Sequence, residues 1–164
     1  MSSGFVWSDW SRRELEGVHP TMVEFANRTL HYSTVDFGVH DGIRTAADQY
    51  ALYKRGVSQR DGYKRPSQHQ KQASGFGEAV DLVPRVNGRW LWDWPMIYDI
   101  ADAAFRAARE IGEPITWGGC WHNITGSNMQ PEWCVQEYVK LRRSQGRRAF
   151  NDGPHWELGD SDYG

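Results

Sequence analysis

The sequence predicts an α+β fold in which helices pack on a small, mainly antiparallel sheet. A helix that opens near Asp93 and Pro95 and ends before Gly112 is predicted to pack on the sheet, because residues 97–111 carry apolar side chains at helical spacing. The Asn87-Gly88 pair is typical of a tight hairpin turn between antiparallel strands. Short apolar and β-branched runs predict strands, and they lie at 34–39, 79–83, 114–117 and 154–158.

Four further helices are expected, at 11–16, 21–30, 46–55 and 132–143. Thr21 and Glu24 have the spacing of a capping box for the second of these. Thr45 is placed to cap the third, which would end before Gly56. The fourth is expected to pack through four side chains, Trp133, Val135, Tyr138 and Leu141.

The length indicates a single domain spanning residues 1–164. With 24% charged and 39% hydrophobic residues, the composition matches neither a disordered nor a membrane protein. The net charge of −2 gives no support to nucleic-acid binding. No apolar run has transmembrane length, and no signal peptide is visible. We therefore expect a protein made in the cytoplasm, without membrane insertion and monomeric by default. Cys120 and Cys134 are expected to be free thiols, although an oxidising periplasm would allow a disulfide.

Two histidines and an aspartate form a candidate metal site. Asp81 lies inside the apolar run 79–83, where a buried carboxylate needs a partner such as a cation. His69 precedes this run, and His155 lies in the last predicted strand. Two imidazoles and a carboxylate suit hydrolytic zinc sites, which leave a fourth position for water. The sequence therefore predicts that His69, Asp81 and His155 bind Zn²⁺.

Asp152 and Arg44 are candidate catalytic residues beside this site. Asp152 lies three residues before His155, from where it could act as a general base and then pass the proton to a leaving amine. Arg44, at a strand–helix junction, could stabilise a developing oxyanion. Structural roles are open for both, because Asp152 could form a turn before Gly153 and Arg44 could form a salt bridge.

The metal ligands have structural alternatives as well. A buried Asp81 could instead cap a loop amide. If His69 is not a ligand, His122 or His40 must supply the second imidazole. Glu157 could orient a histidine ligand, or it could point to solvent.

The order of these motifs resembles a known family of zinc peptidases. The chain contains, in order, Ser67-x-His69, Gly77-x-Ala-Val-Asp81 and Asp152-x-x-His155. These segments are similar to the motifs of the family that includes D-Ala-D-Ala carboxypeptidases, vancomycin-resistance dipeptidases and phage L-alanyl-D-glutamate endopeptidases. The resemblance covers roughly residues 20–160. It implies zinc bound by the two histidines and Asp81, with Asp152 as the catalytic base.

Two other segments extend the resemblance. Gly42-Ile-Arg44-Thr45 is similar to the family's arginine-bearing segment, which implies that Arg44 aids the substrate or the oxyanion. Trp117-Gly-Gly-x-Trp121 is similar to the phage endolysin branch. Ser67, Trp117 and Trp121 are therefore expected to bind substrate, although core packing explains the two tryptophans almost as well.

The chain departs from the family pattern at two places. The histidine and aspartate of the first motif are normally seven residues apart, whereas His69 and Asp81 are twelve apart, and Ser74 at the usual position is a poor zinc ligand. We expect a five-residue insertion near 70–74 that lengthens this loop. A second inserted segment, about 120–150, is expected to add a helix that covers or narrows the cleft.

The resemblance implies a zinc peptidase that hydrolyses peptidoglycan stem peptides. The first expectation is an L-alanyl-D-glutamate endopeptidase, a phage endolysin that accumulates in the host cytoplasm and acts on the wall from the periplasm. One alternative is a D-Ala-D-Ala carboxypeptidase or dipeptidase of the same family. An alternative of another class is a non-catalytic cell-wall-binding module that has lost its metal.

Overall fold

Helices and short strands are interspersed along the chain in this computed structural model, which describes residues 2–160. The described helices are α1 (Asp9–Leu15), α2 (Pro20–Tyr32), α3 (Ala46–Lys54), α4 (Trp94–Ile111) and α5 (Pro131–Ser144). The described strands are β1 (Phe37–Asp41), β2 (Ala79–Val86), β3 (Arg89–Trp90), β4 (Ile115–Trp117), β5 (His122–Asn123) and β6 (His155–Leu158). Helices on a small antiparallel sheet are the expected fold class, which is confirmed.

The sheet has the strand order β1-β2-β6-β4-β5, and β3 pairs with β2. Every pair of strands in the described part of the chain is antiparallel. Val80 on β2 is the direct partner of Trp156 on β6, and both lie in the core together with Leu82. Because side chains alternate between the two faces of a strand, the residues next to them point to the opposite face. The two central strands therefore turn one face, the apolar face, to the core. Their opposite face, called the polar face, carries Asp81, His155 and Glu157 beside the apolar Ala79 and Val83.

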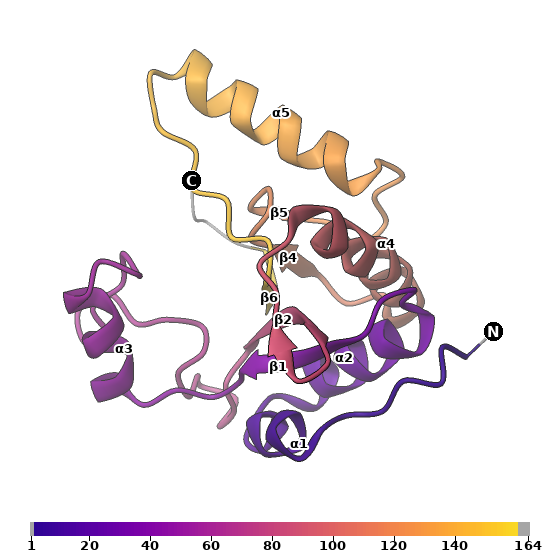
Figure 1. Ribbon diagram of the computed structural model, residues 1–164. Helices are drawn as coiled ribbons and strands as arrows, with labels where there is room; N and C mark the ends of the chain where they lie inside the picture. The colour runs from indigo at the N-terminus through magenta and orange to yellow at the C-terminus, as the bar shows by residue number, and fades with distance from the viewer. Residues whose placement is uncertain (1, 161–164) are drawn as a thin grey trace.

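The apolar face is covered by α2 and α4, which also pack against each other (Figure 1). The structure confirms the predicted helix at α4: the Asp93 carboxylate accepts a hydrogen bond from the Met96 N–H (3.2 Å), and Gly112 ends the helix with φ 78°. Ile100 and Ala104 of α4 are fully buried. Burial of one large aliphatic side chain contributes about 1.5–3 kcal/mol, so these helix–sheet contacts are a main source of stability.

Trp117 lies in this core and not in a groove. Its side chain is 0% exposed, and its indole stacks on Trp156 with ring centroids 5.2 Å apart. The Trp117 Nε1–H donates a hydrogen bond to the Gly153 carbonyl at 2.7 Å. The expectation that Trp117 binds substrate is therefore wrong, because β4 directs this ring towards the helices.

The expected starts of two helices have different outcomes. Thr45 caps α3, since its hydroxyl accepts a hydrogen bond from the Asp48 N–H (3.1 Å). The capping box from Thr21 is wrong, because α2 begins at Pro20 and the Nδ1 atom of His19 accepts the Thr21 N–H (3.1 Å). Proline is favoured at a first helical position, where a backbone N–H would have no partner within the helix.

The packing of α5 differs in part from the expected pattern. Val135 and Tyr138 are buried, whereas the other two expected anchors are about half exposed, at 52% and 50%. Cys134 is buried as well, and its thiol is in hydrogen-bond contact with that of Cys120. Both cysteines are free, as expected. Among the described helices and strands, α5 packs mainly against α4, so only a narrow stripe of its surface is buried.

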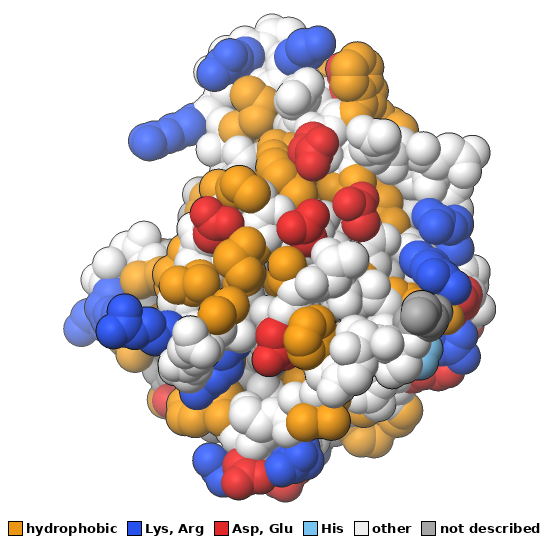
Figure 2. Space-filling view, turned by 45° about the vertical axis from the view of Figure 1, so that its right-hand side comes forward, with side chains coloured by type: hydrophobic (Ala, Val, Ile, Leu, Met, Phe, Trp, Pro, Cys, Tyr) orange, Lys and Arg blue, Asp and Glu red, His pale blue; other side chains and the backbone are white. Residues whose placement is uncertain are grey.

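Acidic side chains gather where α4 and α5 meet. Burial and the neighbouring Glu132 and Asp99 carboxylates raise the pKa of Asp102. Figure 2 shows acidic side chains among hydrophobic ones in the middle of one face, with Lys and Arg side chains towards its edges. None of the described helices is long and apolar enough to cross a membrane.

Candidate metal centre

The polar face of the two central strands carries Asp81 and His155. These residues are direct partners in the antiparallel register of β2 and β6. Their neighbours Val80 and Trp156 point into the core, so strand alternation turns Asp81 and His155 to the other face. Opposed residues on one face of antiparallel strands have Cβ atoms about 4.5–5.5 Å apart. The apolar residues of each strand therefore determine the direction of both polar side chains.

His69 approaches these strands from the loop between α3 and β2. The Glu78 N–H donates a hydrogen bond to the Gln68 carbonyl at 2.8 Å, so the residues that flank His69 and the start of β2 lie side by side. Between these two positions, residues 71–77 form a short hairpin closed by an antiparallel bridge between its ends. Residues 70–74, where an insertion is expected, fall largely within this 71–77 hairpin, and the insertion itself stays a prediction. The extra length is thus directed away from the path that brings His69 to the sheet.

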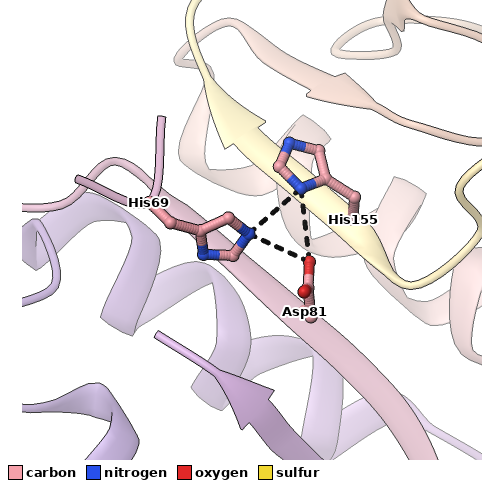
Figure 3. Close-up of side chains that lie close together, drawn as sticks. All are labelled: His69, Asp81 and His155. Atoms are coloured by element: carbon pink, nitrogen blue, oxygen red, sulfur yellow. Dashed lines mark hydrogen bonds and ion pairs between the residues drawn. The ribbon is translucent and has the colours of Figure 1, made fainter. Parts of the chain in front are cut away.

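Three side-chain atoms converge at this point (Figure 3). His69 Nε2 lies 3.1 Å from Asp81 Oδ1 and 3.2 Å from His155 Nδ1, and the last two atoms are 3.2 Å apart. Ligands on bonds of about 2.0–2.1 Å in a tetrahedral site lie about 3.3 Å apart. The observed triangle therefore has the size of one face of a tetrahedral metal site.

The outer partners of the two imidazoles indicate which ring nitrogens carry hydrogens. His69 Nδ1 lies 2.8 Å from the Gly42 carbonyl oxygen, which can only accept, so Nδ1 is the donor. His155 Nε2 lies 2.8 Å from a carboxylate oxygen of the buried Glu157 and donates to it in the same way. In neutral imidazoles the inner nitrogens then hold lone pairs, and both point at the Asp81 carboxylate. A cation satisfies all three acceptors at once.

In the absence of a metal ion, protonation supplies the positive charge. Burial opposes a charged imidazole, but the hydrogen bonds to Asp81 and Glu157 raise the pKa of His155 to about 10. Burial also opposes a charged Asp81, yet the two imidazoles hold the pKa of this carboxyl well below its usual range. The group is therefore built around positive charge, which either a proton or a metal ion can provide.

Asp152 lies at the turn that leads into β6. Its N–H donates to the Gly118 carbonyl (2.9 Å), and its own carbonyl accepts from the His155 N–H (3.1 Å). A Cβ atom at Gly118 would lie 2.4 Å from the Asp152 carbonyl oxygen, so this close approach requires glycine. Within residues 2–160, no group donates a hydrogen bond to the Asp152 carboxylate, which lines the cleft. Burial and the nearby Asp81 charge raise the pKa of Asp152 to about 6.

Arg44 joins the metal group to the neighbouring segment of the chain. Its Nη2 lies 3.4 Å from Asp81 Oδ2 and 3.3 Å from a carboxylate oxygen of Asp41. Its Nη1 donates to the side chain of the buried Gln49 at 2.8 Å. Asp81 thus uses one oxygen towards the imidazoles and the other towards Arg44. Arg44 therefore forms the salt bridge that was the structural alternative to a catalytic role, and it also lines the cleft.

A cleft of about 570 Å³ opens over the metal group. Trp121 lines it with its ring 5.3 Å from that of His155, held by a hydrogen bond from Nε1 to the Phe150 carbonyl (2.7 Å). Trp121 has φ 51°, a conformation that is uncommon for non-glycine residues and concentrates at functional sites. Ser67 also lines the cleft, and its hydroxyl accepts the His69 N–H (3.2 Å). Substrate contact by Trp121 and Ser67 stays a prediction.

The alternative histidine ligands lie elsewhere. His122 is exposed on β5. His40 lines the cleft, but its Nδ1 atom pairs with Asp41 (3.0 Å) and its ring lies edge-on to Trp90 and Trp92. Among the described residues, the group that could hold a metal ion is His69, Asp81 and His155.

Some cleft residues were not expected from the sequence. Arg55 and Arg60 follow α3, Trp92 precedes α4 and Phe150 precedes β6, and all four line the cleft. None belongs to a motif, since each approaches the site only through the tertiary fold. The exposure of Trp92, 61%, is unusual for so large an apolar ring and is a property of the folded chain alone.

Comparison with known proteins gives a consistent family. The model of the phage L-alanyl-D-glutamate peptidase family matches residues 3–158. The chain belongs to this family. It is 30% identical over 149 residues to the L-alanyl-D-glutamate peptidase of Escherichia phage T5, covering 90% of this chain and 93% of that protein. It also resembles the crystal structure of the Serratia marcescens L-Ala D-Glu endopeptidase ChiX, with 30% identity, a TM-score of 0.62, and coverage of 96% of this chain and 93% of ChiX.

Proposed function

We propose that this protein is a zinc peptidase that hydrolyses the L-alanyl-D-glutamate bond of peptidoglycan stem peptides. Its family and relatives support the peptidase activity and the scissile bond. The observation that carries the metal assignment is the convergence of two imidazole nitrogens and one carboxylate oxygen, all acceptors in the tautomers that Gly42 and Glu157 select. Such a mixed nitrogen and oxygen set favours zinc over magnesium or calcium, which prefer oxygen ligands.

The residues of the site have distinct roles in this proposal. His69, Asp81 and His155 would hold the zinc ion, which when bound supplies a Lewis acid that lowers the pKa of water and polarises a carbonyl. Asp152 accepts a proton from the attacking water and delivers it to the amine of the leaving D-glutamate. Arg44 keeps Asp81 oriented and places positive charge beside the developing oxyanion.

The surroundings of the site suit a peptide substrate. The cleft is open and is lined by both polar and aromatic side chains, and Ser67 and Trp121 are the proposed substrate contacts nearest to the ligands. We propose that the chain acts as a monomeric endolysin, made in the host cytoplasm and acting on the wall from the periplasm. We also propose that the segment about 120–150, which contains α5, is an insertion that narrows the cleft near Trp121.

The test is digestion of purified peptidoglycan by zinc-loaded protein, followed by mass spectrometry of the soluble products. Peptides that begin with D-glutamate, together with glycan strands that retain L-alanine, are the expected result. Stripping zinc should stop the release and adding zinc should restore it, whereas Asp152→Asn should release nothing while keeping its metal. Release of terminal D-alanine with the alanyl-glutamate bond intact would instead identify a D-Ala-D-Ala carboxypeptidase or dipeptidase. Wall binding without any cleavage or zinc would identify a binding module.

A further inference from the structure

The wall of the cleft opposite the core is formed by the α3 lobe, defined here as residues 46–66. In Figure 1, α3 and the loop that follows it stand apart from the helices that cover the sheet. Arg55 and Arg60 of this lobe line the same cleft as the three metal-capable side chains. The cleft therefore has a metal site on its floor and two guanidinium groups on one wall.

Three of the four acidic side chains that line the cleft, all but that of Asp152, are engaged by other groups. Asp41 pairs with His40 and Arg44, and Glu157 pairs with His155. Asp81 belongs to the metal group, where Asp152 is the proposed base. Within the described residues, no carboxylate lies within ion-pair distance of Arg55. Arg55 thus presents positive charge to the cleft without an ion-pair partner among residues 2–160.

The α3 lobe is internally cross-linked, so Arg55 is carried on a defined support. The Gln49 side-chain amide donates to the Ser58 hydroxyl (2.8 Å) and to the Arg60 carbonyl (2.9 Å). The same Gln49 accepts a hydrogen bond from Arg44. These bonds connect the wall that carries Arg55 to the arginine that contacts Asp81. The backbone that carries Arg55 is therefore held at a set place relative to the metal group.

We propose that Arg55, reinforced by the charge of Arg60, binds a free carboxylate of the stem peptide and so selects acidic over amidated peptides. This inference rests on the proposed function, because it concerns the substrate of the same site. When the L-alanyl-D-glutamate bond lies at the metal, the part of the peptide that follows this bond carries the free α-carboxylate of D-glutamate. It also offers the side-chain carboxylate of the next residue where that residue is diaminopimelate. Guanidinium groups match carboxylates in shape and charge, and amidation removes that charge.

Binding is measured by calorimetry on the zinc-loaded Asp152→Asn protein, with and without Arg55→Gln. The probes are N-acetylated, C-terminally amidated tetrapeptides. The first contains D-glutamate and lysine, the second D-isoglutamine and lysine, and the third D-glutamate and diaminopimelate. We expect Arg55→Gln to weaken binding of the first probe roughly 5- to 20-fold and to leave the second unchanged. A loss that appears only with the third probe assigns the carboxylate to diaminopimelate, which also supports the proposal.

Lys54→Gln is the matched control, because it removes the same charge from the adjacent residue of the same lobe and Lys54 does not line the cleft. It should leave binding of all three probes unchanged. Equal effects of Arg55→Gln on all probes, or equal effects of the two variants, would overturn the proposal. Failure of the proposed function is seen separately, in the products of the wild-type digest, because the binding comparison requires no hydrolysis.

Discussion

At the scale of single residues, the partners behind the ligands decide what the site can bind. The Gly42 carbonyl and the Glu157 carboxylate each accept an imidazole N–H, and this leaves both inner nitrogens free to donate lone pairs. Glu157 is itself buried, so its negative charge is poorly screened and acts strongly on His155. Glu157, two residues after His155 on the same strand, therefore increases the basicity of this ligand.

Glu157→Gln should weaken zinc binding roughly 10- to 100-fold, because the amide can still accept the His155 N–H but supplies no negative charge. Zinc affinity is measured by competition with a chelating dye, and the fold is checked by circular dichroism. Glu113→Gln, at an exposed position, serves as the control and should bind zinc normally. Unchanged affinity in Glu157→Gln would show that Glu157 does not tune the ligand.

Residue identities in the site were predictable to the extent that they follow from local pattern. Asp81 and His155 are polar residues inside short apolar strands, so alternation places both on the face away from the core. Trp117 has the same local appearance as Trp121, and only the direction of β4 relative to the helices separates the core indole from the cleft indole. Arg55 carries no local signal at all, because its place in the cleft depends on how the α3 lobe folds back.

At the scale of elements, helix α4 and the hairpin at Asn87-Gly88 follow from strong local signals, namely an apolar stripe, a cap and a turn pair. Strand β5 has two residues and is held only by pairing with β4, so its sequence does not mark it. The 71–77 hairpin is a similar case. The interval between His69 and Asp81 predicts extra residues near 70–74 but no hairpin, because the hairpin comes from backbone pairing across its base.

Changing the length of the 71–77 hairpin should leave the metal site intact. Deleting 71–75 restores the shorter interval, and inserting five Gly/Ser residues after Ser74 lengthens it; both variants should retain one zinc ion per chain. A doubled loop costs only about 0.6 kcal/mol in closure entropy, so unfolding temperatures should change little. Metal content is measured by elemental analysis after dialysis. A folded variant that loses zinc would show that the hairpin itself shapes the site.

At the scale of the whole molecule, the metal site joins segments from distant parts of the chain. His69 comes from the loop after α3, Asp81 from β2 and His155 from the last strand. An ion bound by all three stabilises only the folded state, by an amount that grows with the ratio of free ligand to Kd and reaches about 2.7 kcal/mol at 100-fold excess. Binding and folding stability are therefore linked.

Zinc should raise the unfolding temperature by roughly 5–10 °C at 100-fold excess over Kd, and His69→Ala should abolish this shift. At one fixed zinc concentration, the shift should be larger at pH 8 than at pH 6.5. In the metal-free protein the raised pKa of His155, about 10, contributes stability that is fully present below the unfolded value near 6.5 and is lost as pH rises through 10. Zinc must displace that proton, so its affinity should rise roughly tenfold per pH unit in this window.

The measurement is differential scanning calorimetry at both pH values, with and without zinc. Asp152 has a pKa of about 6 and is mostly ionised at both, so the contrast reports mainly on His155. A zinc shift that shrinks as pH rises, or one that persists in His69→Ala, would contradict the linkage.

The closed base of the 71–77 hairpin also has a practical consequence. A pattern search that demands a fixed number of residues between the histidine and the aspartate would pass over a chain of this kind, although its site geometry is intact. The quantity to match is the pairing of Gln68 with Glu78, which fixes His69 whatever lies between. The exposed tip, at Ala73 and Ser74, is consequently a suitable place to attach a label or an affinity tag without disturbing the metal site.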